Sequence, residues 1–389
     1  MMRLIRPVFY NEFEYIADKC SYSCCAGWNI SIDSNTAKEY KTFTGEIGEK
    51  VKECVVSEDS STYHIKLDEN KRCPFLRENG LCEIVLKKGP EYLSNTCARF
   101  PRRFAFYGDV AEISLSSACP AVTEFMFREE QLSFSEDYIE DIVDIDVNDP
   151  SNKHTLFGEE IRKFFIDILR LKDFPFWVKQ YFAARLSKKI ASRYEKRDYD
   201  SVRDEMRIYS NLDYLREYSK SVMAIEPNYI LKFKFLCGLY KYFGGAHTET
   251  LTKYNDVIKN SVSEIDNLTI KELVAIYEKF NAEVYKDIEY AFENSCVNDL
   301  FFKFFSDTKE KCTVYEKCMS VFLLHALIKF TMSVYWYANN YNISRNERID
   351  IISILSRKVL HNNGAIIDFC KAQEEEGLFN PSYLFVIIR

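Results

Sequence analysis

The sequence lacks most of the short motifs that identify enzyme classes. It contains no G-x-x-x-x-G-K-[ST] loop for phosphates and no G-x-S-x-G turn for a nucleophilic serine. Gly244 and Gly245 lack the rest of a dinucleotide fingerprint, and no two histidines form an H-E-x-x-H pair. These absences argue against P-loop enzymes, serine hydrolases, dinucleotide-binding enzymes and zinc proteases, and they leave the catalytic residues unknown.

An excess of positive charge is also missing. The 52 Lys and Arg residues face 59 Asp and Glu residues, a formal net charge of −7, so we expect no nucleic-acid partner. The first ten residues hold no apolar run of signal-peptide length. The most apolar stretch, 319–338, carries His325 and Lys329 near its middle, where charge is costly in lipid. We therefore expect a cytoplasmic protein with a buried core helix here and no membrane partner.

Cysteine is the residue that the chain has in unusual number and order. Eight of the 13 cysteines fall within residues 1–125, and seven of them form one ordered pattern. The pattern reads C-x3-C-C, then C-P-F-L, N-G-L-C, N-T-C-A-R-F-P and A-C-P, and its cysteines are Cys20, Cys24, Cys25, Cys73, Cys82, Cys97 and Cys119. Because cytoplasmic thiols stay reduced, we expect these residues to bind a metal rather than form disulfides.

The spacing does not decide which cysteines bind or what they bind. Zinc takes four thiolates in a tetrahedron, and a [4Fe–4S] cluster also takes four. Seven cysteines exceed either number, so some support the ligands, are structural or bind another centre. Cys24 and Cys25 are adjacent, and we expect only one of them to be a ligand. His64, on the polar face of a predicted strand nearby, is a less favoured substitute ligand.

The chain divides by composition into three parts. Residues 1–128 predict a small α+β domain, with strands at 62–67, 72–76, 81–85 and 110–115, a hairpin turn at Asn79-Gly80 and a helix at 31–41 capped by Asp33 or Ser34. Residues 129–152 predict an acidic connector.

Residues 153–389 predict a large helical domain, because apolar residues recur with helical spacing. The predicted helices cover 161–169, 176–194, 228–242, 270–293, 298–306, 315–338 and 347–360. The expected fold class is mainly α, with a small N-terminal α+β cysteine-cluster domain. The five cysteines outside the first 125 residues lie on apolar stretches, where small core residues are expected.

Several blocks of sequence, taken in order, resemble the flagellin lysine N-methylase family. Four of them carry the cysteine motifs, at 20–28, 65–82, 92–102 and 115–120. Three more lie in the second half: F-E-N-S-C-V-N-D-L-F-F-K-F-F at 292–305, H-A-L-I-K at 325–329 and S-R-K-V-L-H-N at 356–362. The cysteine motifs alone occur in a broader group, and the later blocks make the resemblance more specific.

The resemblance implies methyl transfer from S-adenosylmethionine to lysine side chains of flagellin, and a [4Fe–4S] cluster on the cysteine motif. No glycine-rich βα turn of the usual methyltransferase type is present, so the methyl-donor site stays unknown. The cysteines also do not follow C-x3-C-x2-C, the pattern of radical S-adenosylmethionine enzymes, because Cys25 follows Cys24 directly. The alternatives are a zinc protein and a non-catalytic iron–sulfur or zinc-binding module with a helical partner-binding domain.

Overall fold

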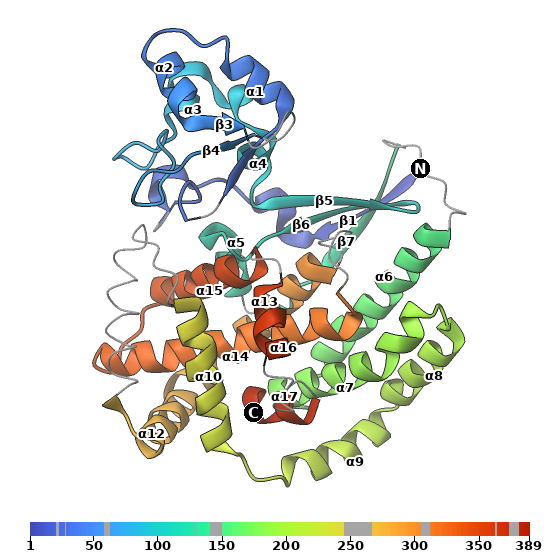
Figure 1. Ribbon diagram of the computed structural model, residues 1–389. Coiled ribbons are helices and arrows are strands. Elements are labelled where there is room, and N and C mark those ends of the chain that lie inside the picture. Colours follow the sequence, from blue (N-terminus) through green and yellow to red (C-terminus); the bar gives the residue numbers. More distant parts are fainter. Residues whose placement is uncertain are drawn as a thin grey trace.

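The computed structural model describes residues 1–20, 23–27, 29–57, 63–128, 130–140, 150–244, 267–304, 312–361, 364–372 and 381–389. Most of these residues are helical, and the strands lie in the first 140 residues (Figure 1). The predicted fold class is confirmed: the protein is mainly α with a small N-terminal α+β region.

A four-stranded sheet joins the beginning of the chain to residues a hundred positions later. Its order is β5-β6-β1-β7, and its strands are β1 (Met2–Pro7), β5 (Arg102–Tyr107), β6 (Val110–Leu115) and β7 (Phe134–Ile139). β1 runs parallel to β6, whereas the β5–β6 and β1–β7 pairs are antiparallel. β7 falls inside the segment predicted as a connector, and the predicted domain boundaries themselves stay a prediction.

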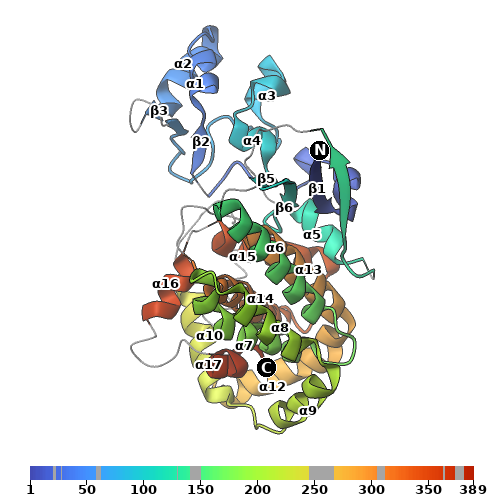
Figure 2. The same cartoon turned by 90° about the vertical axis from the view of Figure 1, so that its right-hand side faces the viewer.

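The residues between β1 and β5 form a separate module (Figure 2). Its sheet has the order β2-β4-β3, from β2 (Ile30–Ile32), β3 (Val55–Ser57) and β4 (Tyr63–Ile65). Its short helices are η2 (Ala17–Lys19), α1 (Ser34–Tyr40), α2 (Gly45–Cys54), α3 (Glu83–Lys88), η3 (Pro90–Tyr92) and α4 (Asn95–Arg99). The helix η1 (Val8–Glu12), which follows β1 directly, instead packs Phe9 into the core of the helical body. The predicted N-cap of α1 is confirmed, because the Asp33 side chain accepts from the Thr36 N–H at 3.0 Å.

Two predicted strands in this module are wrong. Residues 72–76 form only isolated bridges at Arg72 and Leu76, and residues 83–85 begin helix α3. The turn before them is present, but only Gly80 has a positive φ, of 80°. The helix is favoured over the strand because Glu83 and Lys87 form an i,i+4 ion pair at 2.7 Å while Ile84 alone is buried.

The rest of the described chain is a layered helical body. Its elements are α5 (Pro120–Met126), α6 (Pro150–Leu169), α7 (Phe176–Glu195), α8 (Tyr199–Ser210), α9 (Leu212–Met223), α10 (Tyr229–Gly244), α12 (Ile270–Phe280), the π-helix η5 (Asn281–Tyr285), α13 (Lys286–Phe304), α14 (Val314–Ala338), α15 (Arg345–Leu360), α16 (Ala365–Ala372) and α17 (Pro381–Ile388). Thr269, Thr313 and Ser344 begin α12, α14 and α15 with a capping box, in which a Glu three residues later closes the motif.

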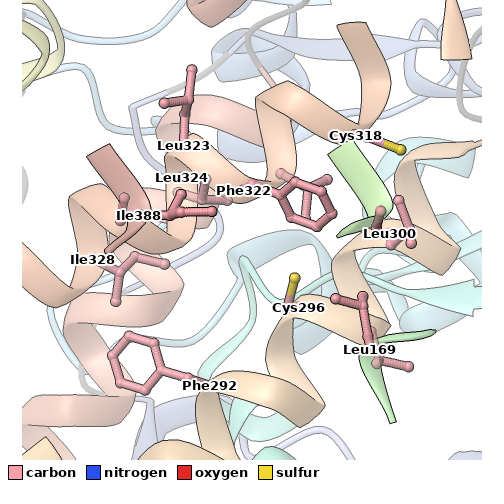
Figure 3. Close-up of a cluster of buried hydrophobic side chains, with 14 of the residues drawn as sticks. Leu169, Phe292, Cys296, Leu300, Cys318, Phe322, Leu323, Leu324, Ile328 and Ile388 are labelled. Atoms are coloured by element: carbon pink, nitrogen blue, oxygen red, sulfur yellow. The ribbon is translucent and has the colours of Figure 1, made fainter. Parts of the chain in front are cut away.

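Helix α14 is the centre of the helical body and contacts α7, α10, α12, α13, α15 and α17. It is long and apolar enough to cross a membrane, but 94% of its most apolar window is buried inside the protein. This agrees with the predicted core helix, since a helix that is apolar on all sides needs protein around it. Cys296 and Cys318 lie among the apolar side chains of this core, as expected for small core cysteines (Figure 3).

The described residues form two separate hydrophobic cores. The small core contains Ile30, Tyr40, Ile65 and Phe75 of the N-terminal module. The large core continues from the helical body into the four-stranded sheet and α5. Most of the sequence between β1 and β5 is therefore an insertion with its own core, carried on the sheet of the larger unit.

Candidate functional site

All seven predicted cysteines line one cavity of about 500 Å³. Cys20, Cys24 and Cys25 come from the loop after η2, Cys73 and Cys82 from the two sides of a turn, Cys97 from α4 and Cys119 from the residue that precedes α5. None of the chain's 13 cysteines forms a disulfide. The structure therefore brings the seven cysteines together at one cavity, and their binding of a metal stays a prediction.

The cavity lies where the two cores meet. Cys119 belongs to the large core, Cys73 belongs to the small core, and Cys25, Cys82 and Cys97 pack against the small core. In Figure 1 the module with α1 to α4 lies above α5 and α15, which belong to the helical body. A group bound by cysteines from both sides would link the two cores.

A tight turn brings Cys73 and Cys82 to the same side of the chain. The Arg77 N–H donates to the Leu81 carbonyl and the Gly80 N–H donates to the Arg77 carbonyl, each at 3.0 Å. Leu76 and Cys82 form the bridge that closes this turn. The turn predicted at Asn79-Gly80 thus positions two of the thiols, even though no strand follows it.

Backbone hydrogen bonds hold the other module cysteines in place. The Cys73 N–H donates to the Cys25 carbonyl at 2.7 Å, which joins the first motif to the second. The Ser94 side chain caps α4 by accepting from the Cys97 N–H at 3.4 Å. The Asn95 N–H donates to the Asp33 carboxylate at 3.0 Å. The protein's own hydrogen bonds therefore hold the loops that carry these cysteines.

Helix α15 contacts the first cysteine motif through a buried arginine. The Arg357 guanidinium donates to the carbonyls of Ser23 at 2.9 Å and Cys24 at 3.3 Å, and also to that of Ala26. Arg357 is only 9% exposed, so these three carbonyls give its donors partners away from solvent. One side chain of the helical body therefore holds the loop that carries Cys24 and Cys25.

The last cysteine motif is held by α13 and by the end of α15. The Asn298 side-chain amide donates to the Leu115 carbonyl and to the Ser117 hydroxyl, each at 2.9 Å. The His361 Nε2 lies 2.7 Å from the Ser116 hydroxyl. Both contacts fix the segment that leads into Cys119.

Burial disfavours the ionised form of most of these thiols. It raises the pKa of Cys20 and of Cys97 to about 11 and also raises the pKa of Cys73. Cys24 differs, because the hydrogen bond that it receives from the Cys25 thiol lowers its pKa and raises that of Cys25. Metal binding at this cavity must therefore displace protons, which makes it dependent on pH.

The donor chemistry of the cavity is almost purely sulfur. Among the described residues that line it there is no Asp, Glu, His, Lys or Arg; the rest are apolar, small or hydroxyl-bearing. Soft thiolates suit zinc and iron–sulfur clusters, so the donor set fits both expected groups. No three His, Cys, Asp or Glu side chains in the described parts of the chain are arranged to hold a single ion. His64 lies on β4 and does not line the cavity.

A pocket of about 350 Å³ shares Ile16, Pro120 and Ala121 with the cysteine cavity. Its carboxylates belong to Glu12, Glu14, Glu124 and Asp350. Arg128 donates to Glu12 at 2.9 Å, and Arg345 donates to Glu124 at 2.7 Å. The wall beside the cysteine cavity therefore carries acidic groups, two of which are already paired with arginine.

Sequence reasoning missed the residues that hold the site from the helical body. Arg357, His361 and Asn298 have no metal-binding or catalytic pattern around them. Their only indication was their position in the blocks 292–305 and 356–362, which carried the family resemblance.

Comparisons with known proteins agree with these blocks. Residues 162–387, more than half of the chain, match the model described as the FliB lysine N-methylase C-terminal domain. A stretch of 122 residues is 34% identical to the flagellar biosynthetic protein FliU of Salmonella muenchen, covering 30% of this chain and 72% of that protein. No solved structure is significantly similar to the chain.

Two lysine-N-methylases, from Salmonella typhimurium and Salmonella choleraesuis, are also 34% identical over 122 residues. The match covers 30% of this chain and 30% of each of those proteins. It therefore spans less than a third of the length of either lysine-N-methylase.

Proposed function

Because the chain belongs to the FliB lysine N-methylase family, we propose that it is a cytoplasmic methyltransferase that transfers methyl groups from S-adenosylmethionine to lysine side chains of flagellin. The observation that carries the proposal is the gathering of all seven motif cysteines in one cavity against the helical domain that defines the family. The relatives' names supply lysine methylation and the flagellum. The methyl donor and the protein substrate are proposed.

The reaction sets clear physical demands. The lysine ammonium first loses a proton, since its ordinary pKa is about 10.4. The nitrogen lone pair then forms the N–CH₃ bond while the S–CH₃ bond of the sulfonium breaks, which leaves S-adenosylhomocysteine. An apolar cavity such as this one excludes water from such a transfer. The neighbouring pocket is lined by four carboxylates and one lysine, Lys19, and this negative balance favours the approach of a cationic side chain.

We also propose that the cysteines hold a [4Fe–4S] cluster, with zinc as the alternative. The sulfur-only donor set supports either group, and Cys20, Cys24, Cys25, Cys73, Cys82, Cys97 and Cys119 are the residues that would supply the ligands. When bound, a cluster supplies a covalent link between the two cores and a redox-active centre beside the cavity. The polar methyl transfer described above does not require its electrons.

The test of the proposed function uses full-length protein purified and reconstituted without oxygen. It is incubated with flagellin and S-adenosylmethionine, and peptide mass spectrometry measures lysine masses. We expect increments of one or more methyl groups. An unmodified flagellin in the presence of a fully loaded metal centre contradicts the enzyme and favours the non-catalytic module.

Metal content is measured separately on cysteine variants. Cys97→Ser should lower the bound iron, whereas Cys54→Ser is the matched control, because Cys54 lies in the same module outside the cavity. Equal loss of iron in both variants contradicts the assignment of the cavity. Zinc without iron in protein prepared and reconstituted in this way favours the zinc alternative.

A further inference from the structure

A smaller pocket of about 190 Å³ opens beside the cysteine cavity. Ala17, Cys20, Ser23 and Gly80 line both spaces, so the two are neighbours. Cys20 is the only cysteine of the motif that reaches the smaller pocket. A ligand in this pocket therefore lies next to the first thiol of the cysteine cavity.

Two opposite charges line the smaller pocket without neutralising each other. They are the Arg72 guanidinium and the Asp18 carboxylate. In the described parts of the chain, neither side chain forms an ion pair or a hydrogen bond, with the other or with a third residue. By contrast, Lys50 and Glu83 of the same module form an ion pair at 2.7 Å. The pocket thus presents one unused cation and one unused anion.

Backbone contacts position Arg72 and Asp18, the two residues that carry these charges. The Arg72 N–H donates to the Asp68 carboxylate at 2.8 Å, and Arg72 forms a bridge with Ala26. Asp18 lies on η2, and its Cα is within 3.6 Å of the position that a side chain at Gly80 would occupy. Asp18 and Arg72 both lie in the segments of the chain that also carry the cysteines.

An α-amino acid is the ligand chemistry that matches this arrangement. Its carboxylate suits a guanidinium, which can donate two parallel hydrogen bonds, and its ammonium suits a carboxylate. We propose that Arg72 and Asp18 bind the α-carboxylate and α-ammonium groups of the methyl donor, with the sulfonium end directed past Cys20 into the larger cavity. This inference rests on the proposed function, because it takes the methyl donor to be S-adenosylmethionine.

Calorimetry on the full chain, loaded without oxygen, tests the inference with two probes. S-adenosylhomocysteine carries the amino-acid end, and 5′-methylthioadenosine lacks it. Arg72→Gln should weaken binding of S-adenosylhomocysteine by about tenfold to a hundredfold, the usual effect of losing a hydrogen bond to a charged group. The same substitution should leave binding of 5′-methylthioadenosine unchanged.

The controls are Arg77→Gln and Glu78→Gln, which remove exposed charges of the same turn that do not line the pocket. Asp18→Asn is a second variant at an exposed position, and it should weaken the first probe alone. Thermal unfolding of each variant reports whether it is folded. Undiminished binding of S-adenosylhomocysteine by both Arg72→Gln and Asp18→Asn overturns the inference, as does equal weakening of both probes. Wild-type protein that binds neither probe instead overturns the proposed methyl donor, and the inference falls with it.

Discussion

The Arg357 guanidinium on α15 donates a hydrogen bond of 3.3 Å to the backbone carbonyl of Cys24. Two further carbonyls of the same loop accept from the same side chain. The helical domain that defines the family thus reaches into the cysteine motif from more than three hundred residues away in sequence. This contact gives the C-terminal domain a direct role in the shape of the cysteine cavity.

Replacing Arg357 by Met should loosen the loop before Cys24. Three carbonyls lose their partner, and that of the buried Ala26 is left unpaired at a cost of about 1–3 kcal/mol. Local opening should therefore become roughly tenfold more frequent or greater. Trypsin cleavage after Lys19, followed by mass spectrometry, measures it. Arg345→Met on the same helix removes an exposed pair with Glu124 and should leave the cleavage rate unchanged; equal acceleration in both variants argues against a specific anchor.

Asn298→Ala should destabilise the junction between α13 and the sheet. The substitution removes both donors to Leu115 and Ser117 and leaves a buried carbonyl unpaired, at a cost of about 2–3 kcal/mol. Denaturant unfolding followed by circular dichroism measures the loss. Asn339→Ala, at a position where the amide bonds only to Asn342, should change stability by less than about 0.5 kcal/mol. Similar losses of stability in the two variants would contradict a specific role of Asn298 at this junction.

Glu112→Gln should be among the most damaging single changes in the sheet. Glu112 accepts from Arg162 at 2.7 Å and from the Tyr107 hydroxyl at 2.8 Å, and all three side chains are buried. Removing one charge of a buried pair leaves the other uncompensated, which costs about 3–5 kcal/mol. The melting temperature should fall by several degrees or more. Glu136→Gln, a half-exposed partner of Arg3, is the control and should melt with the wild type.

His361 should make stability depend on pH in the acid range. Burial, together with Arg357, Arg103 and Lys303, lowers its pKa from 6.5 to about 4. Between these values the unfolded chain takes up a proton that the folded chain does not, so stability falls as the pH falls. The slope is at most about 1.4 kcal/mol per pH unit, or roughly 3 kcal/mol over the window.

Denaturant unfolding at several pH values checks this dependence. His361→Gln should be flatter than the wild type between about pH 6.5 and 4. Ser116→Ala keeps the imidazole and its burial, so its slope should match that of the wild type. An unchanged slope in His361→Gln means that other groups carry the acid sensitivity.

Those parts of the candidate site that depend on neighbouring residues in the sequence were predictable. Cys20, Cys73 and Cys97 could be assigned to one site, because several ordered thiols in a reduced protein are typical of a shared metal or cluster. Helices with strong periodicity or caps were found as well, such as α1 behind Asp33 and α15 behind Ser344. In these cases a few neighbouring residues determine the outcome.

The remainder depends on contacts between distant residues. Strand β1 was not predicted, because its pairing with β6 and β7 determines its conformation more than its own pattern does. Residues 81–85 were predicted as a strand because they follow the hairpin signal Asn79-Gly80, but the pairing of Glu83 with Lys50 and Lys87 accompanies a helix. Arg357 could not be assigned, since nothing local marks which carbonyls an arginine will reach.

The parallel pairing of β1 with β6 has a consequence for how the chain folds during synthesis. Arg3 aligns with Val110, so during synthesis β1 waits for more than a hundred residues until its parallel neighbour β6 is made. The inserted module has its own core, and its contacts are far more local. Loop closure is slower over long separations. The nascent chain should therefore complete the inserted module first and close the sheet around it afterwards, so that the cysteine cavity acquires its second wall only late in translation.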